Sequence, residues 1–166
     1  VKDQHHSEYY KPMLILATDT STPYLSIALC DEAKVIAEIS TLADRKHSEK
    51  LLLYTDQILK ETATELNEID LLAVAHGPGS FTGIRVGVSA WKGLAAGANI
   101  PIIGISTLDS LATRIHSQNG TVCALLDAKM GEVYSAIYQL DNGIRTIQNP
   151  QSVSPIEDVL QHCTQE

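Results

Sequence analysis

Short apolar runs rich in strand-forming residues alternate with polar turns near the start of the sequence. The runs cover residues 14–18, 24–30 and 34–40, and the turns at residues 19–23 and 31–32 are made of Asp, Glu, Ser, Thr and Pro. Runs of this length, bounded by such turns, are typical of neighbouring strands. The pattern predicts three consecutive antiparallel strands.

Apolar residues at helical spacing follow in two longer segments. The first covers residues 48–63, with the serine at its start as the predicted N-cap, and the second covers residues 84–98. Runs typical of buried strands lie before and after the second helix, at residues 71–75 and 101–105. Together with the opening strands, these elements form a predicted α/β lobe at residues 13–106.

The rest of the sequence repeats the opening arrangement. The order of strand, Asp19, polar turn and strand recurs as strand, Asp127, polar turn and strand, which indicates a duplicated fold. A last helix is predicted with Ser154 as N-cap, Pro155 at its first position and Glu157 three residues after the cap. The sequence stops about two turns later, so we expect the second lobe to be incomplete. Its other predicted elements are a helix at residues 107–116 and strands at residues 121–126, 133–140 and 144–148.

The composition is that of a folded protein without a membrane span. Of 166 residues, 44% are hydrophobic and 19% are charged, which is enough to bury a core in one domain or in two lobes, here residues 13–106 and 107–166. No apolar run approaches the roughly 18 residues that a membrane span needs, and the polar start has no signal-peptide core. We therefore expect a cytoplasmic protein, with residues 1–12 as a tag remnant or frayed extension.

Charge and cysteine content narrow the classes of function. A formal net charge of −8 disfavours a large nucleic-acid-binding face, because such faces depend on Lys and Arg. Cys30, Cys123 and Cys163 are far apart and form no C-x-x-C pair, so we expect buried free thiols rather than a disulfide framework or a zinc site.

The glycine-rich segment at residues 77–83 is a candidate binding loop between a strand and a helix. Free N–H groups at such a helix start can receive an anion. We expect a nucleotide or phosphate to contact Asp19, Gly79, Ser80 and Thr82. The alternative is a tight turn whose glycines only supply positive φ angles, and the segment lacks the Gly-Lys-Ser/Thr ending of a P-loop.

Small residues gather on one side of the helix that follows this loop. On a helical wheel this side consists of Gly83, Gly87, Ala90, Leu94 and Gly97, and all of these except Leu94 are small. Small residues let two helix axes approach closely, so this side is predicted to pack against another helix, either the first helix of the same chain or a second subunit. A bulkier stripe is predicted to face the sheet and consists of Ile84, Val88, Trp91 and Ala95.

Isolated polar residues provide no catalytic arrangement. His47 and His76 are not paired at metal-ligand spacing, and nothing links a Ser, a His and an Asp into a triad. Asp19 and Asp127 could each hold a metal through water or orient a phosphate, but an Asp in a turn is more often a local hydrogen-bond acceptor.

Three segments of the sequence resemble the TsaB (YeaZ-like) family. They are residues 14–22 (first signature), residues 77–87 (second signature) and residues 127–134 (third signature). TsaB is the non-catalytic paralogue of TsaD in bacterial tRNA threonylcarbamoyladenosine biosynthesis. The resemblance implies an α/β fold of the actin, sugar kinase and Hsp70 type (ribonuclease H-like), with duplicated lobes.

The resemblance also implies partners rather than an active site. The two metal-binding histidines of TsaD correspond here to Thr107 and Leu111, neither of which can replace an imidazole ligand. The implied protein is a non-enzymatic scaffold that pairs through its first two helices with a TsaD-type subunit, forms a homodimer when alone, recruits a TsaE-type ATPase and contacts tRNA only indirectly. It has no metal and no tightly bound cofactor, with ATP allowed in the complex. The alternatives are a metal- or ATP-dependent enzyme of the same superfamily, a glycoprotease-type peptidase or an ATPase, and a nucleotide-binding regulator.

Overall fold

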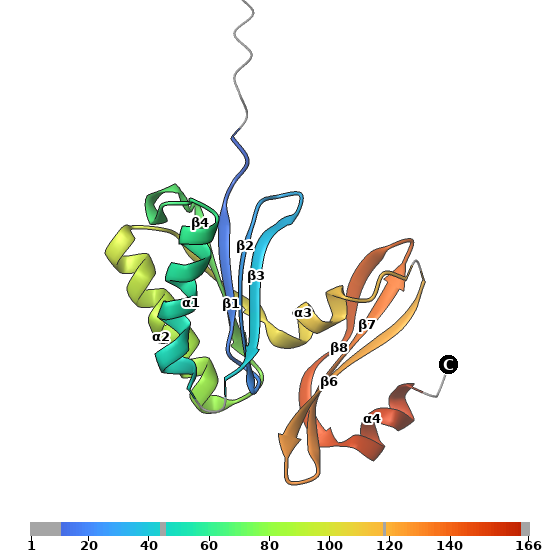
Figure 1. Cartoon of the computed structure of the whole chain (residues 1–166). Helices are drawn as coiled ribbons and strands as arrows, with labels where there is room; N and C mark the ends of the chain where they lie inside the picture. Colours follow the sequence, from blue (N-terminus) through green and yellow to red (C-terminus); the bar gives the residue numbers. More distant parts are fainter. Residues whose placement is uncertain (1–10, 44–45, 118, 164–166) are drawn as a thin grey trace, which may run out of the picture.

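Two β-sheets divide the protein into two lobes (Figure 1). The computed structural model describes residues 11–43, 46–117 and 119–163, so most of the predicted extension at residues 1–12 lies outside the described residues. The elements, in chain order, are β1 (Ile15–Asp19), β2 (Tyr24–Cys30), β3 (Val35–Leu42), α1 (His47–Glu61), the short 3-10 helix η1 (Leu66–Glu68), β4 (Leu71–Gly77), α2 (Phe81–Ala98), β5 (Ile102–Ser106), α3 (Thr107–Thr113), β6 (Gly120–Lys129), β7 (Glu132–Asp141), β8 (Ile144–Pro155) and α4 (Ile156–Cys163).

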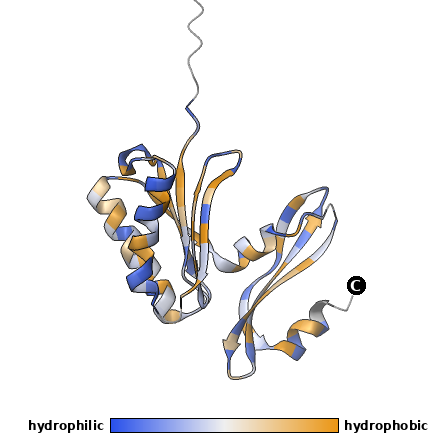
Figure 2. Ribbon diagram, in the orientation of Figure 1, coloured by the Kyte–Doolittle hydropathy of each residue, from blue (hydrophilic) through white to orange (hydrophobic). Residues whose placement is uncertain are grey.

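Sheet A is the five-stranded sheet of the first lobe, with strand order β3-β2-β1-β4-β5. β1, β2 and β3 pair antiparallel, as predicted, and β4 and β5 continue the sheet in parallel. Helices α1 and α2 cover one face, and the other face is turned toward the second lobe (Figure 1). In Figure 2, α1 carries both hydrophilic and hydrophobic residues, as expected of a helix that buries one side.

The core of the first lobe lies between sheet A and the two helices. Leu16, Ile27 and Leu72 are fully buried on the sheet side and Trp91 on the side of α2. The Trp91 indole donates a hydrogen bond to the Leu16 carbonyl oxygen at 3.2 Å. A buried donor without an acceptor would be costly, so this bond lets the largest side chain of the lobe occupy its centre.

Sheet B and α3 form a second, smaller core. Leu108 and Ala112 of α3 pack against a face of sheet B that includes Ala124 and Tyr138. The Tyr138 hydroxyl donates to Asp109 Oδ1 at 2.6 Å. Burial, reinforced by this hydrogen bond, raises the pKa of Tyr138 well above its usual value. α3 is thereby attached to sheet B while its N-terminus continues directly from β5 of sheet A.

The predicted duplication is present in the strand order. Sheet B has the order β6-β7-β8 with antiparallel pairing, which matches β1-β2-β3 of sheet A, and α4 follows β8 as α1 follows β3. Of the residues that the structure describes, no helix combines the length and apolar character that crossing a bilayer requires.

Several predicted boundaries were wrong, each for a local reason. α1 begins at His47 with Lys46 at the N-cap position, so Ser48 lies inside the helix and does not cap it. β8 stays paired with β7 as far as Pro155, which keeps the backbone extended where Ser154 and Pro155 were predicted to start a helix. Cross-strand hydrogen bonds to β7 therefore outweigh the capping pattern in the sequence.

The cysteines also differ from their predicted environment. Cys30 and Cys123 are half-buried rather than fully buried. Partial burial, followed in importance by the neighbouring Asp31 carboxylate, raises the pKa of the Cys30 thiol. A raised pKa lowers the thiolate fraction at neutral pH, and reactivity depends on the thiolate.

Candidate functional site

The first and second signatures meet at the end of sheet A where β1 turns into β2. The Ser21 N–H donates to Asp19 Oδ1 at 2.7 Å, which closes the turn, and the Ser21 carbonyl accepts from the Ser80 N–H at 2.6 Å. Gly79 lies so close to Ser21 that a Cβ at this position would collide with the Ser21 backbone. The glycine is therefore required for the loop to dock on the turn.

Thr20 lies between this turn and α2. It is fully buried, and its hydroxyl donates to the Gly83 carbonyl oxygen at 2.8 Å. A Cβ on Gly83 would collide with the Thr20 carbonyl, and a Cβ on Gly87 would collide with the Thr20 hydroxyl. The glycines of α2 thus make room for Thr20 of the same chain.

The predicted partner face of α2 consequently needs correction. Gly83 and Gly87 are buried with Trp91 and Ala95 in a stripe that faces sheet A, so a helix of another subunit cannot reach them. The helical wheel did not assign Gly83 and Gly87 to the sheet-facing stripe, because glycine has no side chain. The space that their side chains would occupy is filled by Thr20 of the turn after β1.

The other predicted interface residues have mixed positions. Ala90 and Leu94 are half-buried and pack against the core of the first lobe. Gly97 is exposed, and apart from its chain neighbours and its own helix backbone, no heavy atom of the described residues lies within 4 Å of where its Cβ would be. On α1, Leu52 and Leu53 are 56% and 61% exposed. Their exposure was not predicted, although their wheel positions, away from the buried Leu51, Thr55 and Ile58, indicate it.

Ser80, one of the residues predicted to bind phosphate, forms hydrogen bonds within the chain. The Ser80 hydroxyl caps α2 by accepting from the Gly83 N–H at 3.2 Å, and the Ser80 N–H is bonded to Ser21. This cap explains why α2 begins at Phe81, before the predicted start. Thr82 is exposed beside the stacked pair of Phe81 and Arg85, whose guanidinium carbon lies 3.8 Å from the ring centre.

The third signature forms the tip of the β6–β7 hairpin. Asp127 belongs to β6 and pairs with Val133, so the turn is shorter than predicted and centres on Met130 and Gly131. The Asp127 carboxylate accepts from both the side chain and the N–H of Lys129, and these bonds lower its pKa. Asp127 therefore acts as a local hydrogen-bond acceptor, which was the alternative prediction to a metal or phosphate ligand.

The two positions predicted to correspond to the TsaD histidines lie together on α3. Thr107 is buried, with no hydrogen-bond partner for its hydroxyl oxygen in the described residues, and Leu111 packs against the second core. His47 Nε2 contacts the Thr22 carbonyl oxygen at 3.0 Å, and His76 is exposed at the end of β4. Across residues 11–43, 46–117 and 119–163, no three His, Cys, Asp or Glu side chains gather as a metal site would require.

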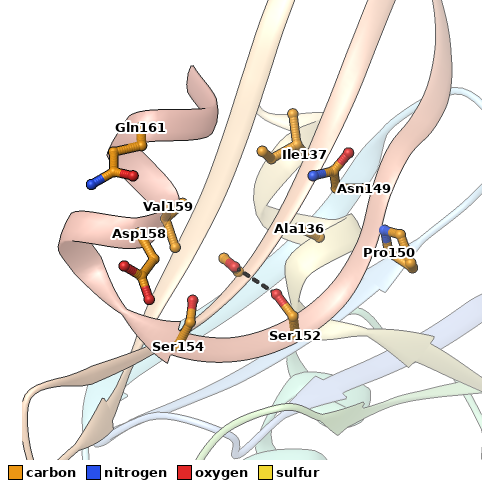
Figure 3. A pocket seen from close by; sticks show the side chains of 10 residues that line it. Ala136, Ile137, Asn149, Pro150, Ser152, Ser154, Asp158, Val159 and Gln161 are labelled. Carbon is orange, nitrogen blue, oxygen red and sulfur yellow. Dashed lines mark hydrogen bonds between the residues drawn. The ribbon is translucent and has the colours of Figure 1, made fainter. Parts of the chain in front are cut away.

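The cavities formed by the described residues include two that lie on the sheets. The larger one, about 370 Å³, is between α4 and strands β7 and β8, where a Ser135–Ser152 hydroxyl contact crosses its floor and Asp158 lies at its rim (Figure 3). The smaller one, about 280 Å³, is a groove on the face of sheet A away from α1 and α2, and it includes Asp19.

Known proteins match this chain in sequence and structure. The family model described as "TsaD: tRNA N6-adenosine threonylcarbamoyltransferase" matches residues 35–165. The "tRNA threonylcarbamoyladenosine biosynthesis protein TsaB" of Escherichia coli is 46% identical over 135 residues, and that of Bacillus subtilis is 39% identical over 132 residues; each match covers 80% of this chain. The chain spans 58% of the length of both relatives.

Solved structures agree with these matches. YeaZ from Pseudomonas aeruginosa superposes with a TM-score of 0.78 at 34% identity, covering 86% of this chain and 68% of that one. The ethanolamine utilization protein EutJ from Carboxydothermus hydrogenoformans shares the fold alone. It is 16% identical, with a TM-score of 0.51, and the match covers 87% of this chain and 53% of that one. The fold is thus the predicted actin-like α/β type, and the chain belongs to the TsaB (YeaZ) family.

Proposed function

We propose that this chain is a non-catalytic scaffold subunit that pairs with a TsaD-type transferase to make threonylcarbamoyladenosine in tRNA. The observation that carries the proposal is the 46% identity to the Escherichia coli protein named for this biosynthesis. A cytoplasmic location is part of the proposal, because the pathway acts on tRNA.

The accessory role is supported by the chemistry of α3. The family resemblance assigns Thr107 and Leu111 to the positions of the metal-binding histidines of TsaD. Thr107 offers a buried hydroxyl, and Leu111 is an apolar side chain packed against the second core. Neither is a ligand that a transition metal prefers.

The pairing surface in this proposal is the outer side of α1 and α2. α1 carries two neighbouring exposed leucines, Leu52 and Leu53, in addition to the buried side that faces its own core. Exposed Gly97 would allow a partner helix to approach α2 closely. A homodimer through the same helices is proposed when the TsaD-type subunit is absent, and a TsaE-type ATPase is proposed to join the complex.

The experiment is a reconstitution of threonylcarbamoyl transfer to tRNA. This chain, its TsaD-type partner and the TsaE-type ATPase are purified and assayed singly and together, and sedimentation follows their association. We expect transfer only when this chain and its partner are both present. Metal- or ATP-dependent turnover by this chain alone would instead support the enzyme alternative.

A nucleotide titration tests the cofactor prediction separately. We propose that the isolated chain holds no cofactor tightly and that ATP binds only in the complex. Tight binding of ATP by the isolated chain would favour the nucleotide-binding regulator.

A further inference from the structure

The open face of sheet A carries a shallow groove with an unusually flat floor. Four alanines on three adjacent strands form this floor, because β1 lies between β2 and β4 and the register aligns Ala17 with both Ala28 and Ala73. No floor side chain extends beyond its Cβ, so the groove of about 280 Å³ stays open above the sheet. Its lining includes Ala17, Ala28, Ala73, Ala75, Ile105 and Ser110.

Asp19 places a carboxylate in this apolar groove. It lies on the same sheet face as Ala17, two residues earlier in β1, and opposite Ser26 of β2. Its Oδ1 accepts from the Ser21 N–H at 2.7 Å. The ion pairs found in the described part of the chain are Lys60–Asp56 and Lys129–Asp127, so no basic side chain there neutralises Asp19.

The chemistry of the groove selects among ligands. An anion would be repelled by Asp19 and by the net charge of −8. A metal ion prefers several oxygen or nitrogen ligands, and Asp19 belongs to no group of three such side chains in the described ranges. An organic cation with a short apolar stem can place its charge against the Asp19 carboxylate and pack its stem on the alanine floor.

We propose that this groove is a binding site for a small organic cation, an ammonium or guanidinium group on a short alkyl stem, with Asp19 as its counter-ion. The volume of about 280 Å³ is slightly below the roughly 300–1,000 Å³ of ligand pockets, which favours a free small molecule over a macromolecular segment. The site is independent of the proposed scaffold function, since the groove lies on the opposite face of sheet A from α1 and α2.

The test is an NMR titration of the full chain with agmatine, which carries a guanidinium and an ammonium at the two ends of a four-carbon stem. We expect shifts of the amide signals of Ala17, Asp19, Ala28 and Ala75 that weaken as salt is added. Butylurea, which keeps the stem and the planar end but lacks both charges, is expected to leave these signals unchanged.

Matched variants connect binding to the carboxylate. Asp19→Asn keeps an oxygen for the Ser21 N–H, so the turn is preserved, and it is expected to weaken agmatine binding by about tenfold or more. Asp56→Asn removes the same charge from the exposed surface of α1 and is expected to leave binding unchanged. A thermal melt of each variant checks that it is folded.

Four results would overturn the proposal. They are the absence of shifts at the groove, agmatine shifts confined to other residues, equal binding by folded Asp19→Asn, and equal binding of butylurea or of neutral adenosine. Tighter binding at Asp19 of a short peptide with one arginine than of agmatine would show that the groove prefers a segment of a macromolecule. That result would overturn the proposal that the ligand is a free small molecule. None of these outcomes depends on transfer to tRNA, so failure here and failure of the scaffold function are distinguishable.

Discussion

The hydroxyl of Thr20 occupies the space where a side chain at Gly87 would begin. The Thr20 Cβ and Cγ2 are each 3.5 Å from the position of such a Cβ, and the hydroxyl is held in place by its bond to the Gly83 carbonyl. α2 therefore rests directly on the turn after β1. The first and second signatures are joined by a steric fit as well as by the Ser80–Ser21 hydrogen bond.

Gly87→Ala is expected to lower the free energy of unfolding by about 1–3 kcal/mol, because the new methyl group overpacks a buried contact. Urea denaturation measures the change. Gly97→Ala in the same helix is the matched control, and it is expected to stabilise by about 0.5–1 kcal/mol because its Cβ meets nothing. Equal stability of the two variants would contradict the packing of α2 on Thr20. If Gly87→Ala is destabilised as expected, any loss of association in this variant reports damage to the fold rather than to an interface.

Ser80→Ala is expected to cost about 1 kcal/mol of stability, because the Gly83 N–H loses its acceptor at the start of α2. Thr82→Ala, two residues on and exposed, should change stability by less than about 0.5 kcal/mol. Denaturation of both variants at the same pH provides the measurement. An equal loss in Thr82→Ala would show that its hydroxyl does more than the structure assigns.

Tyr138→Phe is expected to cost about 1.5 kcal/mol at neutral pH by removing the bond to Asp109. Because the folded-state pKa is raised above the unfolded value of about 10, the tyrosine contributes fully below that pH and its contribution is lost as the pH rises further. The stability difference between wild type and variant should therefore shrink above about pH 10. Urea unfolding across this range tests the sign, with Tyr134→Phe on the same strand as the control. A difference that grows with pH would contradict the assignment.

Leu53→Lys is expected to weaken association with the TsaD-type subunit about tenfold or more, since it places a charge in the centre of the proposed helical interface. Ile144→Lys makes a comparable change at a residue that is 68% exposed in the second lobe and should leave association unaffected. Sedimentation and co-purification measure both. Equal behaviour of the two variants would move the interface away from α1.

The periodicity of the sequence was sufficient for most of the architecture. The alternation over residues 24–30 and the helical spacing over residues 84–98 are local properties of the chain. The strand formed over the predicted residues, and the helix covers the predicted residues but begins earlier, at Phe81. The repeated hairpin with Asp19 and Asp127 indicated the duplication for the same reason. Glycines and prolines also marked the loop between β4 and α2, because they restrict or release the backbone locally.

Only the tertiary structure decided which partner each face has. The wheel of α2 grouped Gly83 and Gly87 with Gly97, but Thr20, distant in sequence, covers the first two and leaves the third exposed. The capping pattern at Ser154 was locally valid, yet pairing with β7 kept that backbone extended. Asp19 meets its alanine neighbours only because β2 and β4 lie on either side of β1. Sequence determines the local conformation a segment prefers, whereas burial and contact depend on segments brought together from elsewhere in the chain.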